Sequence, residues 1–206
     1  MSISTSGTAP RTRRSPEAAR ENILAAAEAI LVASGPQHLK LAEVARGAGV
    51  VHASVLHHFG SIDGVQNALM ARMVQQLVAR VLATTAEARN PAQVAGIGIE
   101  ALFDAFEARG AARLAAWLEL TGESRRLTLV REAVREVIAV RAPLDNGVSA
   151  DAMEDFMLAS ISIALGVGLF GATLSALLGK PESRARDVAL ALLKDRLAAA
   201  GANRAT

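Results

Sequence analysis

The sequence predicts an all-α protein, and three observations point to that class. Alanine, the residue with the highest helix propensity, accounts for 44 of the 206 residues, whereas aromatic residues, which favour strands, make up only 3%. Apolar residues recur three or four positions apart, as Ile23, Ala27 and Ile30 do on one helical face. Glycine and proline separate such segments along the chain. A content of 51% hydrophobic and 20% charged residues excludes a disordered chain.

Nine helices are expected, bounded by residues that cap or interrupt helices. Ser15 can cap the first helix, Pro16 fits its first turn, and Gly35 follows its last residue. No segment shows the alternation of a strand, and no internal repeat is visible. The expected ranges are about 16–34, 41–47, 51–58, 61–85, 91–109, 111–121, 124–141, 152–178 and 182–200.

Enzymatic function has little support in the composition. The chain has no cysteine, which removes disulfides, cysteine-ligated zinc and a thiol nucleophile. His52 and His57 are five residues apart, a poor spacing for two ligands of one metal on a helix. Paired acids such as Asp104 and Glu107 fit solvated helix faces better than acid–base catalysis. We therefore expect no enzyme, no metal and no cofactor, and the missing cysteines are compatible with the cytoplasm.

Residues at about 40–59 have the spacing of a helix-turn-helix. Ala45 is small enough for two helices to cross closely. Gly49, four residues later, suits a turn that needs a left-handed backbone. Val55, six residues further, would pack the second helix onto the first. Two helices held in this way can place the second in the major groove of DNA.

An arginine-rich arm precedes this motif. The net charge of +2 is too small to indicate nucleic-acid binding, but the distribution of charge is uneven. Residues 1–20 contain four arginines and a single acidic residue, Glu17. We expect Arg11, Arg13 and Arg14 to meet DNA phosphates.

With these features, the N-terminal part of the chain resembles the TetR family of bacterial transcriptional regulators. LAEVARGAGV, from Leu41, resembles the family's second helix and turn, and VLHHFGSIDGV, from Val55, resembles the end of its recognition helix and the start of helix four. The length and the nine-helix count also agree. The resemblance implies a homodimeric repressor that leaves its double-stranded DNA operator when a small molecule binds. The expected domains are a basic arm at 1–15, a DNA-binding domain at 16–60 and an effector-binding and dimerisation domain at 61–206.

The sequence departs from the family pattern at several positions that meet DNA. Lys40 and Val51 stand where the family usually has serine or threonine at the starts of its second and third helices. Leu56 replaces a common tyrosine, and Ile62 replaces a lysine that meets phosphate. Two interpretations stay open. Either the protein binds DNA weakly or with little selectivity, or other residues make contacts to DNA in place of those that are missing. The candidate DNA-binding residues are Arg11, Arg13, Arg14, Lys40, His52, Ser54 and His57.

An effector pocket is the next expectation. Phe103, Phe106 and Trp117 fall on expected helices that, by the resemblance to the TetR family, would line an internal pocket. An apolar pocket with few polar groups would suit a hydrophobic or aromatic ligand. The alternative is that these aromatic side chains simply fill the core, where aromatic residues contribute most of their energy.

The last two helices carry the expected dimer interface. The segment 156–179 has no charged residue and is long enough to span a bilayer, so a membrane-anchored helical protein is the competing interpretation. Against a span stand its serines and threonine and the acidic residues before it. The resemblance instead places the family's dimer contact on this helix and the next. The expected interface residues are a small-residue stripe of Ser160, Ala164, Gly168, Ala172 and Ala176, followed by Val188 and Leu192.

Overall fold

The computed structural model describes residues 15–85, 91–123, 132, 135 and 150–202. Its described parts contain eight α-helices and one short 3₁₀ helix, so the all-α prediction is confirmed. The helix expected at 124–141 and the arm at 1–14 lie outside these residues, apart from two isolated positions. The helices are α1 (Pro16–Ser34), η1 (Pro36–His38), α2 (Leu41–Ala48), α3 (His52–Phe59), α4 (Ile62–Thr85), α5 (Pro91–Phe106), α6 (Ala111–Leu120), α8 (Ala150–Leu177) and α9 (Arg184–Ala202).

Helix α1 begins and ends at the residues that the sequence indicates. The Ser15 hydroxyl accepts a hydrogen bond of 3.1 Å from the Ala18 N–H, which satisfies one of the free donors of the first turn. Gly35 ends the helix with a positive φ, and its N–H donates to the Leu31 carbonyl. The helix buries one face through Ile23, Ala27 and Leu31.

Helices α2 and α3 form the helix-turn-helix. Gly49 adopts a left-handed conformation with φ of 65°, and the next N–H, that of Val50, donates to the Ala45 carbonyl at 3.0 Å. Ala45 is 3% exposed and Val55 is fully buried, so the small residue and the valine both lie at the contact between the helices.

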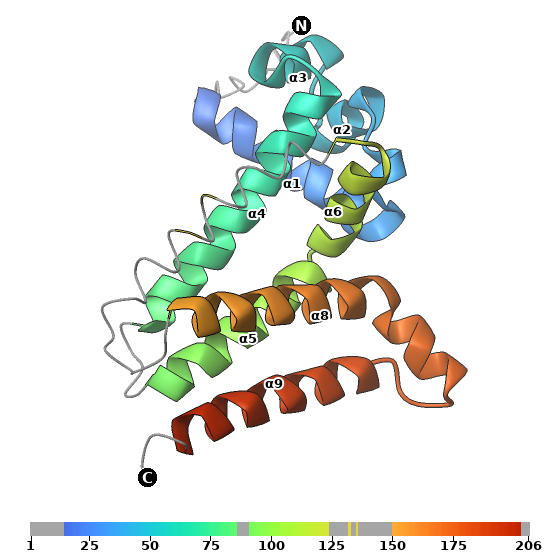
Figure 1. The fold of residues 1–206 in the computed structure, drawn as a ribbon. Coiled ribbons are helices and arrows are strands. Elements are labelled where there is room, and N and C mark those ends of the chain that lie inside the picture. Colours follow the sequence, from blue (N-terminus) through green and yellow to red (C-terminus); the bar gives the residue numbers. More distant parts are fainter. Residues whose placement is uncertain (1–14, 86–90, 124–131, 133–134, 136–149, 203–206) are drawn as a thin grey trace, which may run out of the picture.

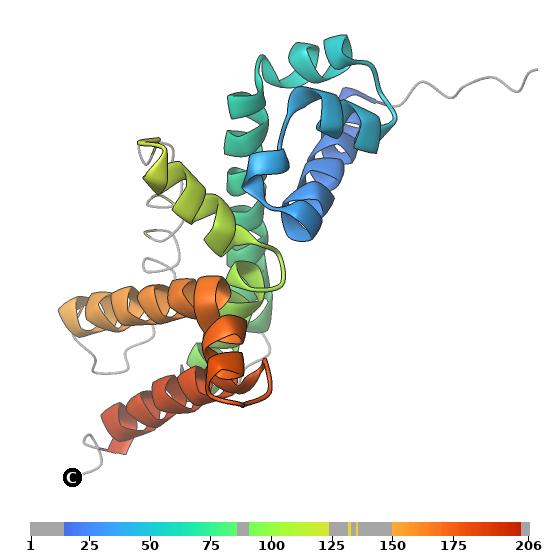
Figure 2. The same ribbon diagram turned by 90° about the vertical axis from the view of Figure 1, so that its right-hand side faces the viewer.

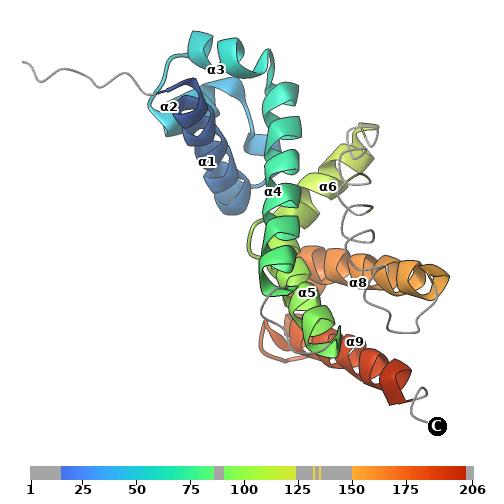
Figure 3. The same cartoon turned by 90° about the vertical axis from the view of Figure 1, so that its left-hand side faces the viewer.

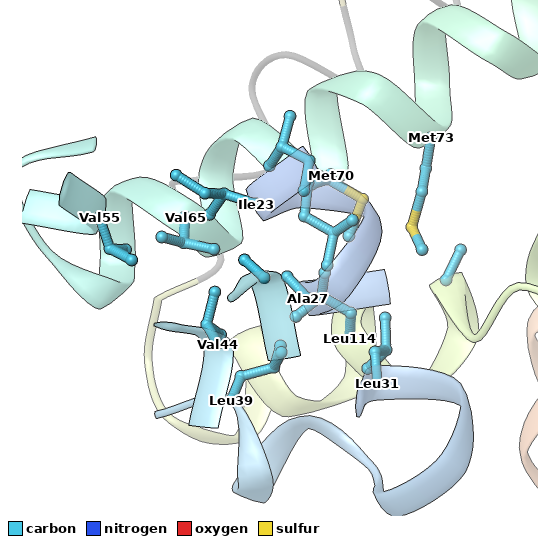
Figure 4. Close-up of a cluster of buried hydrophobic side chains, with 14 of the residues drawn as sticks. Ile23, Ala27, Leu31, Leu39, Val44, Val55, Val65, Met70, Met73 and Leu114 are labelled. Atoms are coloured by element: carbon cyan, nitrogen blue, oxygen red, sulfur yellow. The ribbon is translucent and has the colours of Figure 1, made fainter. Parts of the chain in front are cut away.

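The first hydrophobic core joins this motif to both α4 and α6. Figure 4 shows Val44, Val55 and Val65 in one cluster with Ile23 of α1 and Leu114 of α6. Since α6 contributes buried side chains, the DNA-binding helices do not have a core of their own. Any movement of α6 therefore acts directly on the packing of the helix-turn-helix.

Helix α4 runs between the two ends of the molecule. The helix-turn-helix lies at its start, while α8 and α9 lie beside its other end (Figures 1 and 2). There, α5, α8 and α9 enclose a second core around Phe103, Ala164 and Leu193. Figure 3 shows α5 beside the end of α4, with α9 on its other side.

Helix α8 has one face packed within the chain and one face exposed. Ser160, Ala164 and Ser175 are buried, and the Ser160 hydroxyl donates to the Phe156 carbonyl at 2.7 Å. On the other face Leu158, Phe170 and Leu174 are 66%, 58% and 54% exposed. In the described parts of the chain, α8 is the helix long and apolar enough to cross a bilayer. Core helices of soluble proteins meet the same criterion, so length and composition alone do not decide between the two.

Candidate DNA-binding site

Contacts from α1 fix the position of the recognition helix α3. The Arg20 guanidinium donates to the His58 carbonyl at 2.6 Å and lies 4.3 Å from the centre of the Phe59 ring. Asn22 donates to the Ala48 carbonyl at the end of α2, at 2.7 Å. One helix therefore holds the C-terminal ends of both helices of the motif. Sequence reasoning missed Arg20 and Asn22, because their partners lie 38 and 26 residues away.

A tight corner joins α3 to α4. Gly60 has φ of 74°, and the Ser61 hydroxyl accepts from the Gly64 N–H at 3.0 Å, which caps the start of α4. A Cβ atom added to Gly64 would overlap the Phe59 carbonyl oxygen. Only glycine at position 64 therefore lets α4 approach the end of α3 this closely.

The face of α3 that points away from the core is small and apolar between two histidines. His52 and His57 are exposed and Ser54 is half-buried. The His57 and His58 rings meet edge to face with 5.2 Å between centroids, which restricts the orientation of His57. Val51 and Leu56, at two of the departures from the family pattern, are 69% and 42% exposed. Neither α2 nor α3 has a side-chain N-cap, because Lys40 and Val51 stand at those positions.

Basic groups beside α3 complete the candidate site. Lys40 is exposed immediately before α2, where it can reach a phosphate. Arg46 is also exposed on α2, although it forms an ion pair with Glu43 three residues before it. Arg11, Arg13 and Arg14 lie outside the described residues. Lys40 directly precedes α2, and His52, Ser54 and His57 lie on α3. Helices α2 and α3 lie together at one end of the molecule (Figure 1).

Ion pairs and hydrogen bonds connect α1 to α4, to the turn before α6 and to α6 itself. Glu28 of α1 pairs with Arg72 of α4 and, at 2.6 Å, with Arg109 in the turn before α6. Arg109 also donates to Gln76 of α4, and Arg113 of α6 donates to the Val32 carbonyl of α1 at 3.1 Å. These contacts between charged and polar groups hold α1, α4 and α6 together. They have no sequence signature, because each joins residues distant along the chain.

A second set of ion pairs connects α9 to α4 through α5. Arg186 donates to Asp104 at 2.6 Å and to Glu107 at 3.0 Å, and Arg80 pairs with Asp104 at 2.8 Å. Burial alone would lower the pKa of Arg186, but the hydrogen bonds to Asp104 and Glu107 outweigh it and raise that pKa above its ordinary value. The expectation that Asp104 and Glu107 only face solvent is therefore corrected, because both neutralise a partly buried guanidinium.

The three candidate effector residues occupy different environments. Phe103 is fully buried against Ala164 and Leu193, which is the core position given as the alternative. Phe106 is partly buried against the same cluster. Trp117 is 36% exposed on α6 and belongs to neither core. Of the three, Phe106 and Trp117 keep surface that a ligand could contact.

Part of the small-residue stripe of α8 packs against other helices of the same chain. A Cβ added to Gly168 would lie 2.9 Å from the Ala112 Cβ and 3.0 Å from the Phe106 carbonyl oxygen. Ser160 and Ala164 are buried on the same side. Small residues permit close packing against any helix, whether in the same chain or another. Ala172, Ala176, Val188 and Leu192 are exposed.

Comparisons with known proteins agree with this geometry. Residues 23–69 match the family model described as bacterial regulatory proteins, tetR family. The fatty acid degradation regulator FadR from Bacillus halodurans has 15% identity and a TM-score of 0.60, over 89% of this chain and 97% of that one. A transcriptional regulator from Rhodococcus sp. Rha1 has 24% identity and a TM-score of 0.62, over 86% of this chain and 95% of that one. The multidrug binding protein EbrR, complexed with imidazole, has 22% identity and a TM-score of 0.51, over 84% and 93%.

A helix-turn-helix carried on a long α4 and backed by further helices is typical of DNA-binding transcriptional regulators. The matched segment begins in α1 and ends within α4, so it contains the whole helix-turn-helix. The helix-turn-helix segment therefore matches the TetR family, and the chain as a whole shares the fold of the solved regulators. No curated protein sequence matches it at a significant level.

Proposed function

We propose that the protein is a homodimeric repressor, released from its operator when a small hydrophobic molecule binds its C-terminal domain. The observation that carries this proposal is the direct attachment of the helix-turn-helix to the C-terminal domain. Leu114 and Leu118 of α6 are buried in the same core as Val55 of α3. A ligand that displaces α6 would therefore change the position of α3. In a dimer, a small change in the spacing of two recognition helices costs affinity for paired half-sites.

In this proposal, residues 16–60 bind DNA, residues 1–15 add phosphate contacts, and residues 61–206 bind the effector and a second chain. The contacts to DNA come from Arg11, Arg13, Arg14, Lys40, His52, Ser54 and His57. The protein acts in the cytoplasm, where it meets its operator.

The exposed side of α8 and α9 supports the dimer. Phe170 and Leu174 lie four residues apart on α8, Leu178 follows directly after its last residue, and all three are more than half exposed. Val188 and Leu192 follow on α9 with 41% and 62% exposure. A contiguous apolar surface of this kind is typical of a protein or membrane contact. A second copy of the chain would cover it with the same surface, as a two-fold dimer requires.

The class of effector is supported by the side chains near α6 and by proteins of the same fold. Phe106 is partly buried and Trp117 is 36% exposed, so both offer aromatic surface. Two structural relatives are described as a fatty acid degradation regulator and a multidrug binding protein. Both descriptions suit hydrophobic ligands.

Two experiments test the proposal. Selection of bound fragments from random or genomic DNA with the purified full chain should yield an operator. If no duplex is enriched at low salt, the DNA-binding assignment fails. Palmitate, palmitoyl-CoA and rhodamine 6G are then titrated into free and operator-bound protein. By linkage, an inducer must bind the free protein more tightly, and equal affinities exclude that probe as an inducer.

A further inference from the structure

The chemistry of α3 is unusual for a helix that reads DNA bases. Its eight residues, His52–Phe59, include no arginine, lysine, asparagine or glutamine. Those four side chains provide the specific contacts to guanine and adenine, because they can form two hydrogen bonds to one base. Without them, α3 has no side chain that makes such a bidentate contact.

The exposed surface of α3 is instead largely hydrocarbon. Val51 at the N-cap is 69% exposed, Leu56 five residues later is 42% exposed, and Ala53, between them in sequence, is also exposed. None of the three belongs to the core, to which α3 contributes the fully buried Val55. Apolar side chains on the outer face gain free energy only when another surface removes them from water.

His52 and His57 lie beside these apolar side chains on α3. Residues four apart lie above one another on a helix, so His52 aligns with Leu56 and Ala53 aligns with His57. Each row therefore carries one apolar side chain and one imidazole. The T-shaped contact with His58 restricts His57 to the outer face. An imidazole can make one hydrogen bond to a base edge or a phosphate, which positions the helix but discriminates weakly among bases.

Only one base edge in the major groove offers a hydrocarbon group, the 5-methyl of thymine. We propose that α3 reads thymine methyl groups through Val51, Ala53 and Leu56, so that the operator half-site is rich in A·T pairs at the positions under α3. This inference rests on the DNA binding assigned above. It adds the class of base pair recognised and the residues that select it.

The size of the effect follows from the area that one methyl group buries. Removing a buried methyl costs about a fourfold loss of affinity at each contacted thymine. Three contacts in each half-site would together provide a selectivity of about sixtyfold over positions that lack the methyl. That is within the range that proteins obtain from base contacts in one half-site.

The test uses the full-length protein and the operator obtained by selection. Each thymine of a half-site is replaced in turn by deoxyuridine, which removes the methyl and leaves all hydrogen-bonding groups unchanged. We expect about a fourfold loss of affinity at two or three adjacent positions and no change elsewhere. Leu56→Ala should abolish the loss at one of these positions, because the variant no longer contacts that methyl. Leu120→Ala, which alters an 86% exposed leucine on the distant α6, is the matched control and should keep every loss.

The outcomes separate this inference from DNA binding itself. A selected operator without thymine under α3, or one in which deoxyuridine is tolerated at every position, overturns the inference and leaves DNA binding intact. Losses that are the same in wild type and in both Leu56→Ala and Val51→Ala overturn the assignment of residues. Because Leu56 and Val51 are exposed, both variants should keep the unfolding temperature of the wild type, which is measured alongside.

Discussion

Arg109 donates from its Nε to the Glu28 carboxylate at 2.7 Å, and this bond joins the turn before α6 to the middle of α1. Glu28 at the same time pairs with Arg72 of α4. The Arg72 and Glu28 side chains are only 12% and 18% exposed, so solvent screens this pair much less than a surface ion pair. Glu28 is the shared acceptor of two arginines from the part of the chain that follows the helix-turn-helix.

Replacing Glu28 by glutamine tests the energetic importance of this junction. The change leaves the Arg72 guanidinium nearly buried, with Glu21, at 3.2 Å, as its remaining carboxylate. We expect a loss of about 1–3 kcal/mol in the free energy of unfolding, measured by urea titration. Glu43→Gln is the control, because Glu43 pairs with the exposed Arg46 on the surface of α2 and should cost less than about 0.5 kcal/mol. Equal effects of the two variants would contradict the prediction.

Gly64 should tolerate no side chain. Gly64→Ala forces α4 away from the Phe59 carbonyl, so α3 must shift or its last turn must open. We expect a loss of stability of about 1–3 kcal/mol together with at least tenfold weaker operator binding. Gly96→Ala on α5 is the control: a Cβ there meets nothing within 4 Å, and the change should leave stability equal or slightly higher. Operator binding by Gly64→Ala at wild-type strength would refute the importance of this corner.

The basic groups should determine how strongly salt weakens DNA binding. Each phosphate contact contributes about 0.9 to the slope of log K against log salt concentration. Replacing Arg11, Arg13 and Arg14 together by alanine should therefore reduce the slope by up to about 2.7 and weaken binding to all sequences alike. Lys40→Ala should reduce it by about 0.9. Unchanged slopes would show that these residues do not meet phosphates, whatever the affinity.

The dimer is tested at the exposed face of α8. Wild-type protein should have the mass of a dimer in detergent-free solution, measured by light scattering during gel filtration. Leu174→Glu places a charge in the contact twice, once from each chain, and should raise the dimer dissociation constant by at least about a hundredfold. Leu120→Glu on α6 is the control and should remain dimeric. A soluble wild-type monomer removes the proposed interface, and recovery only with membranes favours the anchored alternative.

Gly168→Arg, by contrast, should disrupt the chain itself. The arginine would meet Ala112 and the Phe106 carbonyl within the same molecule, so α8 could no longer pack against the start of α6. We expect a loss of several kcal/mol in stability at every protein concentration. A folded monomer of wild-type stability would instead support the original expectation that Gly168 lies between two chains.

The sequence by itself determined the helices and the helix-turn-helix. Helix boundaries depend on local groups, such as the Ser15 hydroxyl at the start of α1 or the left-handed Gly49 after α2, and these act over three or four residues. The apolar spacing likewise showed which face of each helix turns inward. The resemblance to the TetR family followed from the same local segment, which the family model also matches.

Only the tertiary structure decided what each helix face contacts. The sequence of α8 shows small residues at fixed intervals, but it does not reveal that Gly168 meets Ala112 in the same chain while Leu174 stays exposed. It gives no sign that Glu28 accepts from Arg109, 81 residues away. Ion pairs and close helix contacts of this kind depend on the relative placement of distant segments. That placement is set by how the whole set of apolar faces can be buried together, and no local pattern encodes it.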